Sequence, residues 1–407
     1  MRNPRNVIYA SLKKVINYSK TNEYKGYCKF DALNSPIIYR FSRNNKLLKL
    51  KAIQVVSHMP FNIRPLLGVP KGRNPKGIGN FIRAYAYLFM VEPKDYYLSE
   101  IKKLSDWLLA NRFTPNTMFQ GMCWGYNYPW ESAHFSASYG FPNCIVTVFV
   151  AEALLDAYLI TRKEKYLVGA ESAANFLLND LPVLEEKKES KCIGYVPAHV
   201  KSKVININAV TAGFLSRLSV TISKPSLLDA AIKLCNYVAS TQTADHAWYY
   251  TDPELHPDQG YDNYHTGGIL DGLFEVINTS GDAYLREIYL KGLKFYKNTH
   301  FDMDGAPKYT STSRYPYDAH AAAQGILTFI KAATHQPAYY RQAEKIALWT
   351  INHLQHFKKG YFMYQIHPFP FLNHRYPLMR WTNSWMSMAL AAVVNFSGTM
   401  DITGEQG

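Results

Sequence analysis

The stretch that decides the fold is DNYHTGGILDGLFEVI (262–277), followed closely by GDAYLREIYLKGLKFYKNT (281–299). If the first segment is helical, its apolar and small residues occupy nearly all sides of the helix, which predicts that the helix is buried. The second segment has one apolar stripe and a charged opposite face, which predicts a helix with solvent on one side. Together they predict a helical hairpin with an inner and an outer member.

The same pair recurs along the chain. Apolar helices rich in small residues are expected at 75–90, 142–160, 206–218, 262–277, 317–330 and 382–394. Charge-striped helices are expected at 5–20, 95–112, 163–181, 225–242, 281–299 and 337–355. Six antiparallel hairpins of this kind predict an all-α fold, an (α/α)6 toroid in which a double-layered ring has every inner helix starting at one mouth. The alternative is an open solenoid of helix pairs.

Residues outside the hairpins define the remaining organisation. Residues 21–74 fit no helical pair and are predicted to form a basic, extended or β-like arm. We expect residues 1–396 to form one toroid domain that includes this arm, with 397–407 as a C-terminal tail. Short polar side chains at the inner-helix starts predict N-caps. The candidates are Asn143, Asn206 or Asn208, Asp262, and Thr382 or Asn383.

Positive charge is concentrated in the first quarter of the chain. The net charge is +14, and residues 1–112 hold 21 Lys and Arg against 6 Asp and Glu. Such a bias suits an acidic ligand or an anionic lipid surface. No zinc finger, RNP-like motif or helix-turn-helix pattern accompanies it, so no nucleic-acid partner is expected. Arg64, Lys71, Arg73 and Lys76 precede the first inner helix and are expected near the mouth.

Aromatic and polar residues gather in the loops before the second, fourth, fifth and sixth inner helices. Flat rings stack on the C–H faces of sugars, and a few polar groups fix the hydroxyls. These loops therefore predict a carbohydrate cleft at the mouth. The residues expected to bind the sugar are Trp124, Tyr126, His134, Tyr139, Asn143, Asn263, Arg314, Tyr317, Arg380, Trp381 and Arg64.

Two chemistries suit this cleft, and the residues leave both open. Glycoside hydrolysis needs a pair of carboxyl groups. Removal of the C5 proton of a uronic acid needs a base and an acid such as Tyr or His, with Arg neutralising the sugar carboxylate. A non-catalytic glycan-binding scaffold is the third possibility. The candidate catalytic residues are Asp262, Asp318, His265, Tyr264, His320 and Glu131.

Cysteine usage and hydropathy bear on compartment and cofactors. Five scattered cysteines without C-x-x-C spacing predict buried free thiols in a reducing cytoplasm. No metal site and no cofactor are expected, and DMDG (302–305) is interpreted as a turn. No secretory signal follows the first residue, and the most apolar segment, 143–160, is interrupted by Glu152 and Asp156.

The loop motifs resemble those of a known family. NIRPLLGVPKGRNPKG (62–77), WGYNYPWES (124–132), GFPNCIVT (140–147), GYDNYHTGGILDGL (260–273), RYPYDAHAAAQGI (314–326) and MRWTNSWMSMALA (379–391) together look like the VpsJ-type polysaccharide biosynthesis proteins. The resemblance covers nearly the whole chain. It implies a cytoplasmic toroid protein of capsule or exopolysaccharide synthesis, acting on a glycan or lipid-linked oligosaccharide beside other assembly proteins. Peripheral contact with the inner face of an anionic membrane, through the basic quarter, fits this setting.

A more distant resemblance concerns two inner helices. YDNYHTGG (261–268) and AHAAAQGILTFI (319–330) are similar to the helical domain of glucuronyl C5-epimerases. The β-rich region that those epimerases add is absent from this sequence. The resemblance implies uronate epimerisation as one activity for the mouth.

Overall fold

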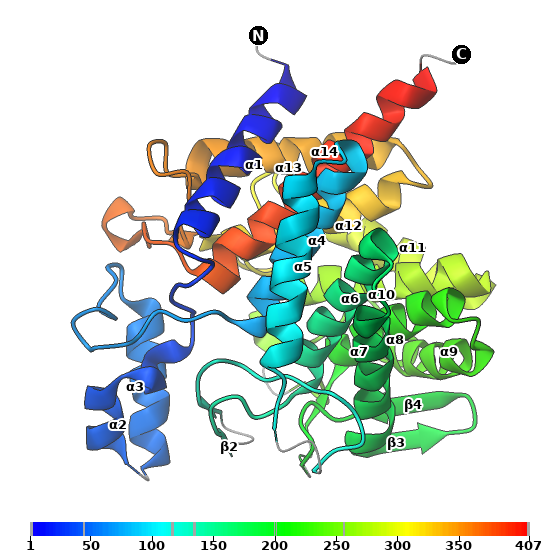
Figure 1. Ribbon diagram of the computed structural model, residues 1–407, viewed down its shortest axis with the longest axis horizontal. Coiled ribbons are helices and arrows are strands. Elements are labelled where there is room, and N and C mark those ends of the chain that lie inside the picture. Colours follow the sequence, from blue (N-terminus) through cyan, green and yellow to red (C-terminus); the bar gives the residue numbers. More distant parts are fainter. Residues whose placement is uncertain are drawn as a thin grey trace.

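The inner layer consists of six helices that close into a ring. The computed structural model describes residues 3–43, 45–114, 118–132, 136–198, 200, 202–254 and 257–404. The inner helices are α4 (Pro75–Val91), α6 (Cys144–Thr161), α8 (Ile205–Thr221), α10 (Asn263–Ser280), α12 (Ala319–Ala333) and α14 (Ser384–Gly404). Each packs against the next in this order, and α14 packs against α4 (Figure 1). The predicted (α/α)6 toroid is confirmed, and the open solenoid is wrong.

Six outer helices cover the ring. They are α1 (Pro4–Thr21), α5 (Asp95–Ala110), α7 (Glu164–Asn175), α9 (Pro225–Ser240), α11 (Ala283–Thr299) and α13 (Ala338–Leu354). The first helix of the chain, α1, packs on the last one, α14, and on α13. The N-terminal and C-terminal helices therefore complete the sixth pair, which joins the two ends of the ring. A π-helical turn, η2 (Phe176–Asp180), extends α7.

Close crossings in the ring depend on small residues. A Cβ atom added to Gly272 of α10 would overlap the backbone carbonyl of Ala209 in α8. A Cβ added to Gly213 of α8 would lie 3.1 Å from the Cα atom of Gly272. α6 is long and apolar enough to cross a membrane by length and composition, yet 67% of it is buried inside the protein. Its apolar character is explained by its place in the ring.

Short antiparallel pairs connect the loops at the mouth. β1 (Trp130–Glu131) pairs with β2 (Ser136–Ala137), and β3 (Val183–Lys187) pairs with β4 (Ser190–Ile193). β5 (Lys203–Val204) pairs with β6 (Thr251–Asp252), with Lys203 opposite Asp252. β7 (Tyr317–Asp318) pairs with β8 (Gln365–Ile366), with Asp318 opposite Gln365. The last two pairs join the loops that lead into neighbouring inner helices. Two short turns, η3 (Pro257–Gln259) and η4 (Pro370–Leu372), lie in the same loops.

The arm before the first inner helix is helical, so the prediction of an extended or β element at 21–74 is wrong. It contains η1 (Asp31–Asn34), α2 (Pro36–Ser42) and α3 (Lys46–His58), which lie at the edge of the ring in Figure 1. Ser35 caps α2, and Asn45 caps α3 through the Leu48 N–H at 3.1 Å. These caps override the β-like run of β-branched and aromatic residues. Among the described residues of the arm, Gly26 and Gly72 alone pair in extended form, through two backbone hydrogen bonds.

Several helix starts differ from the sequence expectation. Asn143 and Asp262 are N-caps as predicted, and Asp318 caps α12. The prediction for Asn206 or Asn208 is wrong, because α8 already begins at Ile205 after an uncapped Val204. A π-helical turn, η5 (Met379–Asn383), precedes α14, so neither Thr382 nor Asn383 is an N-cap. Helix α14 runs to Gly404, and the segment from 397 is therefore helical up to that residue.

Candidate active site

Asp318 lies at the start of α12, where the loops of the mouth converge. Its Oδ1 atom accepts the backbone N–H of His320 at 2.7 Å and the indole N–H of Trp381 at 3.1 Å. Its Oδ2 atom accepts from the Gln365 side chain at 2.8 Å. The side chain has no exposure. Asp318 therefore positions Trp381 and the start of α12, and its oxygens do not face the opening.

Asp262 and His265 form a side-chain pair at the start of α10. The Oδ1 atom of Asp262 caps the helix by accepting the His265 N–H at 2.8 Å, and its Oδ2 atom lies in hydrogen-bond contact with Nδ1 of the same histidine. Burial raises the pKa of Asp262, but the His265 ring and N–H outweigh this and lower it below its usual value. The carboxylate therefore stays ionised and orients the imidazole, as in an acid–base pair.

His320 is enclosed by three aromatic rings. Its ring centre lies 4.7 Å from that of Tyr264 in a stacked arrangement and 4.6 Å from that of Trp381. The Trp385 ring lies 4.2 Å away. Burial, followed by the charges of Lys76 and other nearby cations, lowers the pKa of His320 well below its usual value. The imidazole is therefore neutral at pH 7, and its Nδ1 atom has no hydrogen-bond partner among the residues that the structure describes.

Three cations surround this histidine. Nζ of Lys29 lies 4.5 Å from the centre of the Trp381 ring, and Nζ of Lys76 lies 5.2 Å from that of Trp385. The Arg380 guanidinium lies 5.0 Å from the centre of the Trp381 ring. All three side chains belong to residues less than a tenth exposed, and none forms an ion pair with a carboxylate in the described part of the chain. Burial lowers the pKa of both lysines.

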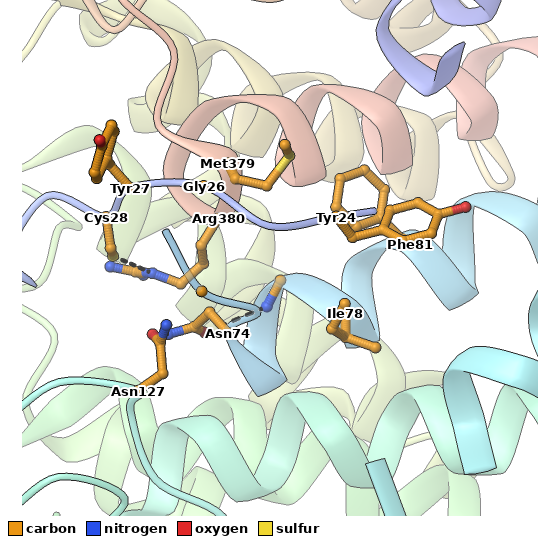
Figure 2. A pocket seen from close by; sticks show the side chains of 12 residues that line it. Tyr24, Gly26, Tyr27, Cys28, Asn74, Ile78, Phe81, Asn127, Met379 and Arg380 are labelled. Atoms are coloured by element: carbon orange, nitrogen blue, oxygen red, sulfur yellow. Dashed lines mark hydrogen bonds between the residues drawn. The ribbon is translucent and has the colours of Figure 1, made fainter. Parts of the chain in front are cut away.

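Figure 2 shows how Arg380 is held against the first inner helix. Its Nε atom donates to Sγ of Cys28 at 3.0 Å. Its Nη2 atom donates to the Tyr128 hydroxyl at 3.3 Å. A Cβ added to Gly77 would lie 3.2 Å from Cβ of Arg380, so glycine permits this close approach. A cavity of about 10 Å³ remains beside it. Cys28 and Tyr128 therefore position Arg380, and no carboxylate among the described residues forms an ion pair with it.

A wall of tyrosines borders the cations. The Tyr126 ring stacks on that of Tyr128 at 5.0 Å, and its hydroxyl lies 3.2 Å from that of Tyr195. The Tyr250 ring stacks on that of His265 at 4.4 Å. Asn143 lines a cavity of about 10 Å³ with Tyr126 and Tyr195. Rings and hydroxyls of this kind suit the two faces of a sugar.

Several predicted binding residues hold the fold and do not line the mouth. Arg64 is fully buried, pairs with Asp31 at 2.6 Å and donates to the carbonyls of residues 28 and 29. The Trp124 indole donates to the carbonyl of Leu108. Asn263 is buried and bonds to Tyr296 and to two loop carbonyls. The expectation that these side chains reach a ligand is therefore corrected.

Other candidates lie away from the cluster. Arg314 pairs with Asp302 at 3.0 Å, and Tyr317 contacts the same carboxylate and the Trp349 ring of the outer helix α13. Tyr139 is exposed. Glu131 accepts from Ser136 and lies 3.8 Å from Nζ of Lys49. His134 lies outside the described residues.

The structure also brings in residues that the sequence did not single out as site residues. Lys29 and Tyr195 belong to segments that carry no repeat motif, and Tyr250 lies in the loop joined to β5. The sequence placed Lys76 near the mouth only as one of four basic residues, together with Arg64, Lys71 and Arg73. Within the described ranges, no group of three or more His, Cys, Asp and Glu side chains could hold a metal ion.

Comparisons with known proteins support the fold. No family model matches the chain, and no curated protein is similar to it in sequence. Among solved structures it is similar to an unsaturated glucuronyl hydrolase specific for heparin, with 14% identity over 98% of both chains and a TM-score of 0.65. It is also similar to the cellobiose 2-epimerase of Bacillus thermoamylovorans, with 10% identity over 80% of this chain and 90% of that chain and a TM-score of 0.58. The GH76 α-mannanase of Bacteroides thetaiotaomicron matches with 15% identity over 81% of this chain and 87% of that chain, at a TM-score of 0.58. These neighbours are toroid enzymes that process carbohydrates.

Proposed function

We propose that this protein is a carbohydrate-active enzyme that binds an acidic sugar at the mouth of the ring and transfers a proton on it. The observation that carries this proposal is the group of Lys29, Lys76 and Arg380 around the neutral His320. None of these three buried side chains forms an ion pair with a carboxylate among the described residues, although the charge of Asp318 acts on Lys29. Keeping uncompensated charge in a buried site costs free energy unless a ligand supplies the opposite charge.

The cations define where a uronate carboxylate is held. Arg380 offers a planar guanidinium and the lysines offer point charges, so the carboxylate of the sugar replaces the missing ion-pair partners. Neutralising that carboxylate stabilises the negative charge that develops on it when the neighbouring C5–H bond breaks. The tyrosine wall is available to stack on the sugar ring.

His320 is the proposed base. It accepts the C5 proton, and the electron pair of the broken C–H bond delocalises onto the carboxylate. In epimerisation, a proton returns to C5 from the opposite face, supplied by His265 held by Asp262. In elimination, the C4–O bond breaks instead, a C4=C5 double bond forms, and the departing oxygen takes a proton. Both outcomes use a neutral histidine with a lowered pKa.

The biological setting is part of the proposal. The resemblance to VpsJ-type proteins favours a cytoplasmic role in capsule or exopolysaccharide synthesis. The solved structures similar to this chain include a glucuronyl hydrolase, which fits a sugar with an acidic group as the substrate, and a cellobiose 2-epimerase, which fits epimerisation as the reaction.

Incubation with defined uronate glycans in deuterated water tests the proposal. We expect deuterium at C5, or the absorbance of an unsaturated uronate. Replacing His320 by Gln should lower kcat at least ~100-fold, the usual contribution of a general base. Lys29→Met should instead raise KM. Arg314→Gln is the matched control, because Arg314 lies outside the cluster. Absence of both signals on every uronate glycan would contradict the proposal.

Hydrolysis is the second candidate, because Asp262 is an ionised carboxylate at the mouth and two of the similar structures are hydrolases. It predicts release of a reducing end without deuterium at C5, and loss of cleavage in Asp262→Asn. Full cleavage by that variant would exclude Asp262 from the reaction. Saturable glycan binding with neither product would instead identify a scaffold protein.

A further inference from the structure

The helical arm carries an unusual surface on α2 and α3, which we call the α2–α3 hairpin (residues 36–58). Eight of the twenty-four exposed large apolar side chains among the described residues lie between Ile37 and Leu66. Phe41 is 77% exposed and Leu47 is 69% exposed, on either side of the turn that joins the two helices. One third of these exposed apolar side chains therefore lie within a segment of thirty residues, and such a concentration is typical of a contact surface.

The apolar residues are not confined to one side of the hairpin. Ile37, Tyr39 and Phe41 are all exposed, and on a helix the first and second of these point in nearly opposite directions. The small core of the arm, Ala32, Leu33, Ile53 and Val56, leaves them uncovered. A protein groove accepts one stripe of a helix, whereas a lipid bilayer accepts apolar residues around the whole tip.

The charge of the hairpin selects the kind of bilayer. From Ala32 to Val91 the chain has ten Lys or Arg and no Asp or Glu. Arg40, Arg43 and Lys46 are exposed beside the apolar tip. In a bilayer, the aromatic and aliphatic residues of the tip would contact the acyl chains, and the neighbouring cations would contact anionic headgroups. A second copy of the chain would place the same cations against each other, which disfavours self-association through this surface.

We propose that the α2–α3 hairpin docks this protein on the anionic surface of a lipid bilayer. The hairpin borders the loop before the second inner helix, since Lys49 of α3 lies 3.8 Å from Glu131. The Phe30 ring, just before the hairpin, links it to the mouth, because it lies 4.7 Å from the ring of Trp130 and 5.9 Å from that of Trp381. The Tyr376 hydroxyl donates to the carbonyl of Met59, directly after α3. Docking therefore holds the mouth next to the lipid headgroups, where a lipid-linked glycan would be presented if the proposed function holds.

Flotation of the full-length protein with vesicles tests the docking independently of any activity. We expect binding to vesicles of phosphatidylcholine and phosphatidylglycerol, little binding to pure phosphatidylcholine, and weakening by salt. The double variant Phe41→Ser with Leu47→Ser should reduce the partition coefficient at least about tenfold. Arg43→Gln with Lys46→Gln should reduce it by about fivefold for each charge removed.

Matched controls alter equally exposed positions elsewhere. Met303→Ser, at a residue that is 94% exposed, and Lys358→Gln with Lys359→Gln should bind like the unaltered chain. Because all these side chains lie at the surface, unchanged circular dichroism and Tm are expected for every variant. Equal binding to neutral vesicles, unaltered binding by the hairpin variants, or no binding to any vesicle would overturn the proposal. A dimer in solution that Phe41→Ser with Leu47→Ser turns into a monomer would overturn it as well.

Discussion

At the scale of single residues, the site is distinguished by charges whose usual partners are missing. Lys29 and Lys76 are buried among aromatic rings, and burial lowers the pKa of each amino group. An anion bound between them would favour their charged forms and raise both pKa values again. The cluster therefore couples ligand binding to proton uptake.

This coupling is measurable by calorimetry. At a pH in the range where the free lysines lose their protons, titration of D-glucuronate in two buffers with different ionisation enthalpies should give different heats, showing uptake of up to about one proton per lysine. The affinity should fall as the pH rises through the lowered lysine pKa values. Lys29→Met should reduce the uptake, and D-glucose should show none. Identical heats in both buffers would contradict a role for the lysines in anion binding.

Asp318 is a buried carboxylate that we expect to contribute to the stability of the fold and not to the reaction. Replacing it by Ala leaves the buried donors of Gln365 and Trp381 without acceptors, which should cost about 2–4 kcal/mol of unfolding free energy. Urea denaturation measures the change. Asp229→Ala, at an exposed position of α9, is the control and should stay within ~0.5 kcal/mol.

At the scale of elements, the packing of α8 against α10 depends on one missing side chain. Gly272→Ala would drive a methyl group into the carbonyl of Ala209, and the two helices would have to separate. We expect a loss of about 1–3 kcal/mol or more in unfolding free energy, as for other overpacked sites.

Gly268, one turn earlier in α10, provides the matched control. The nearest atom to a Cβ added there is Cγ1 of Val210 at 3.9 Å, an ordinary contact. Gly268→Ala should therefore be neutral or stabilise the protein by up to ~1 kcal/mol through helix propensity. Thermal unfolding of both variants would show opposite changes in Tm. A similar decrease in Tm for both variants would contradict the role of the α8–α10 crossing in requiring glycine at position 272.

At the scale of the whole molecule, the ring contains a charged interior below the mouth. A cavity of about 70 Å³ is lined by charged groups of four inner helices. They include Arg83, which pairs with Asp156 at 2.9 Å, and Lys331, which pairs with Glu275 at 2.5 Å. In contrast to the mouth cations, these charges are paired with each other. The charged side chains inside the ring thus form ion pairs, whereas the cations described at the mouth do not.

Acid should destabilise the folded ring. Burial lowers the pKa of His300 to about 4, below its usual value of 6.5. Between these values the unfolded chain binds a proton that the folded chain does not. The histidine's contribution is therefore complete above pH 6.5 and decreases by ~1.4 kcal/mol per pH unit toward pH 4.

Urea unfolding at pH 7 and pH 5 measures this loss. His300→Phe should show a shallower pH dependence. Because neither ring nitrogen of His300 has a hydrogen-bond partner in the described part of the chain, the variant should keep its fold at pH 7. An unchanged pH dependence in His300→Phe would show that other groups control acid stability.

The sequence by itself determined the ring. Apolar periodicity marks the starts of α4, α6, α8, α10, α12 and α14 within a few residues, because a helix with apolar residues on all sides has to be buried, whereas the end of α14 at Gly404 was not predicted. It also placed Asp262, His265, Tyr264, His320, Arg380 and Trp381 at inner-helix starts, since antiparallel hairpins bring all these starts to one mouth. The local hydrophobic pattern was therefore sufficient to predict the inner helices and the residues at their starts.

Only the tertiary structure decided which of these side chains face the opening. Asp318 and Asp262 occupy equivalent N-cap positions, yet long-range donors from Gln365 and Trp381 bury the first, while the second stays beside the mouth. Lys29 reaches the site because the pairing of Gly26 with Gly72 holds this part of the arm at the mouth. Hydrophobic periodicity in the sequence does not predict this contact. The helical arm was missed for a related reason. Its short helices depend on single capping residues and a small core closed by Arg64 and Asp31, and hydrophobic periodicity does not record contacts between distant parts of a chain.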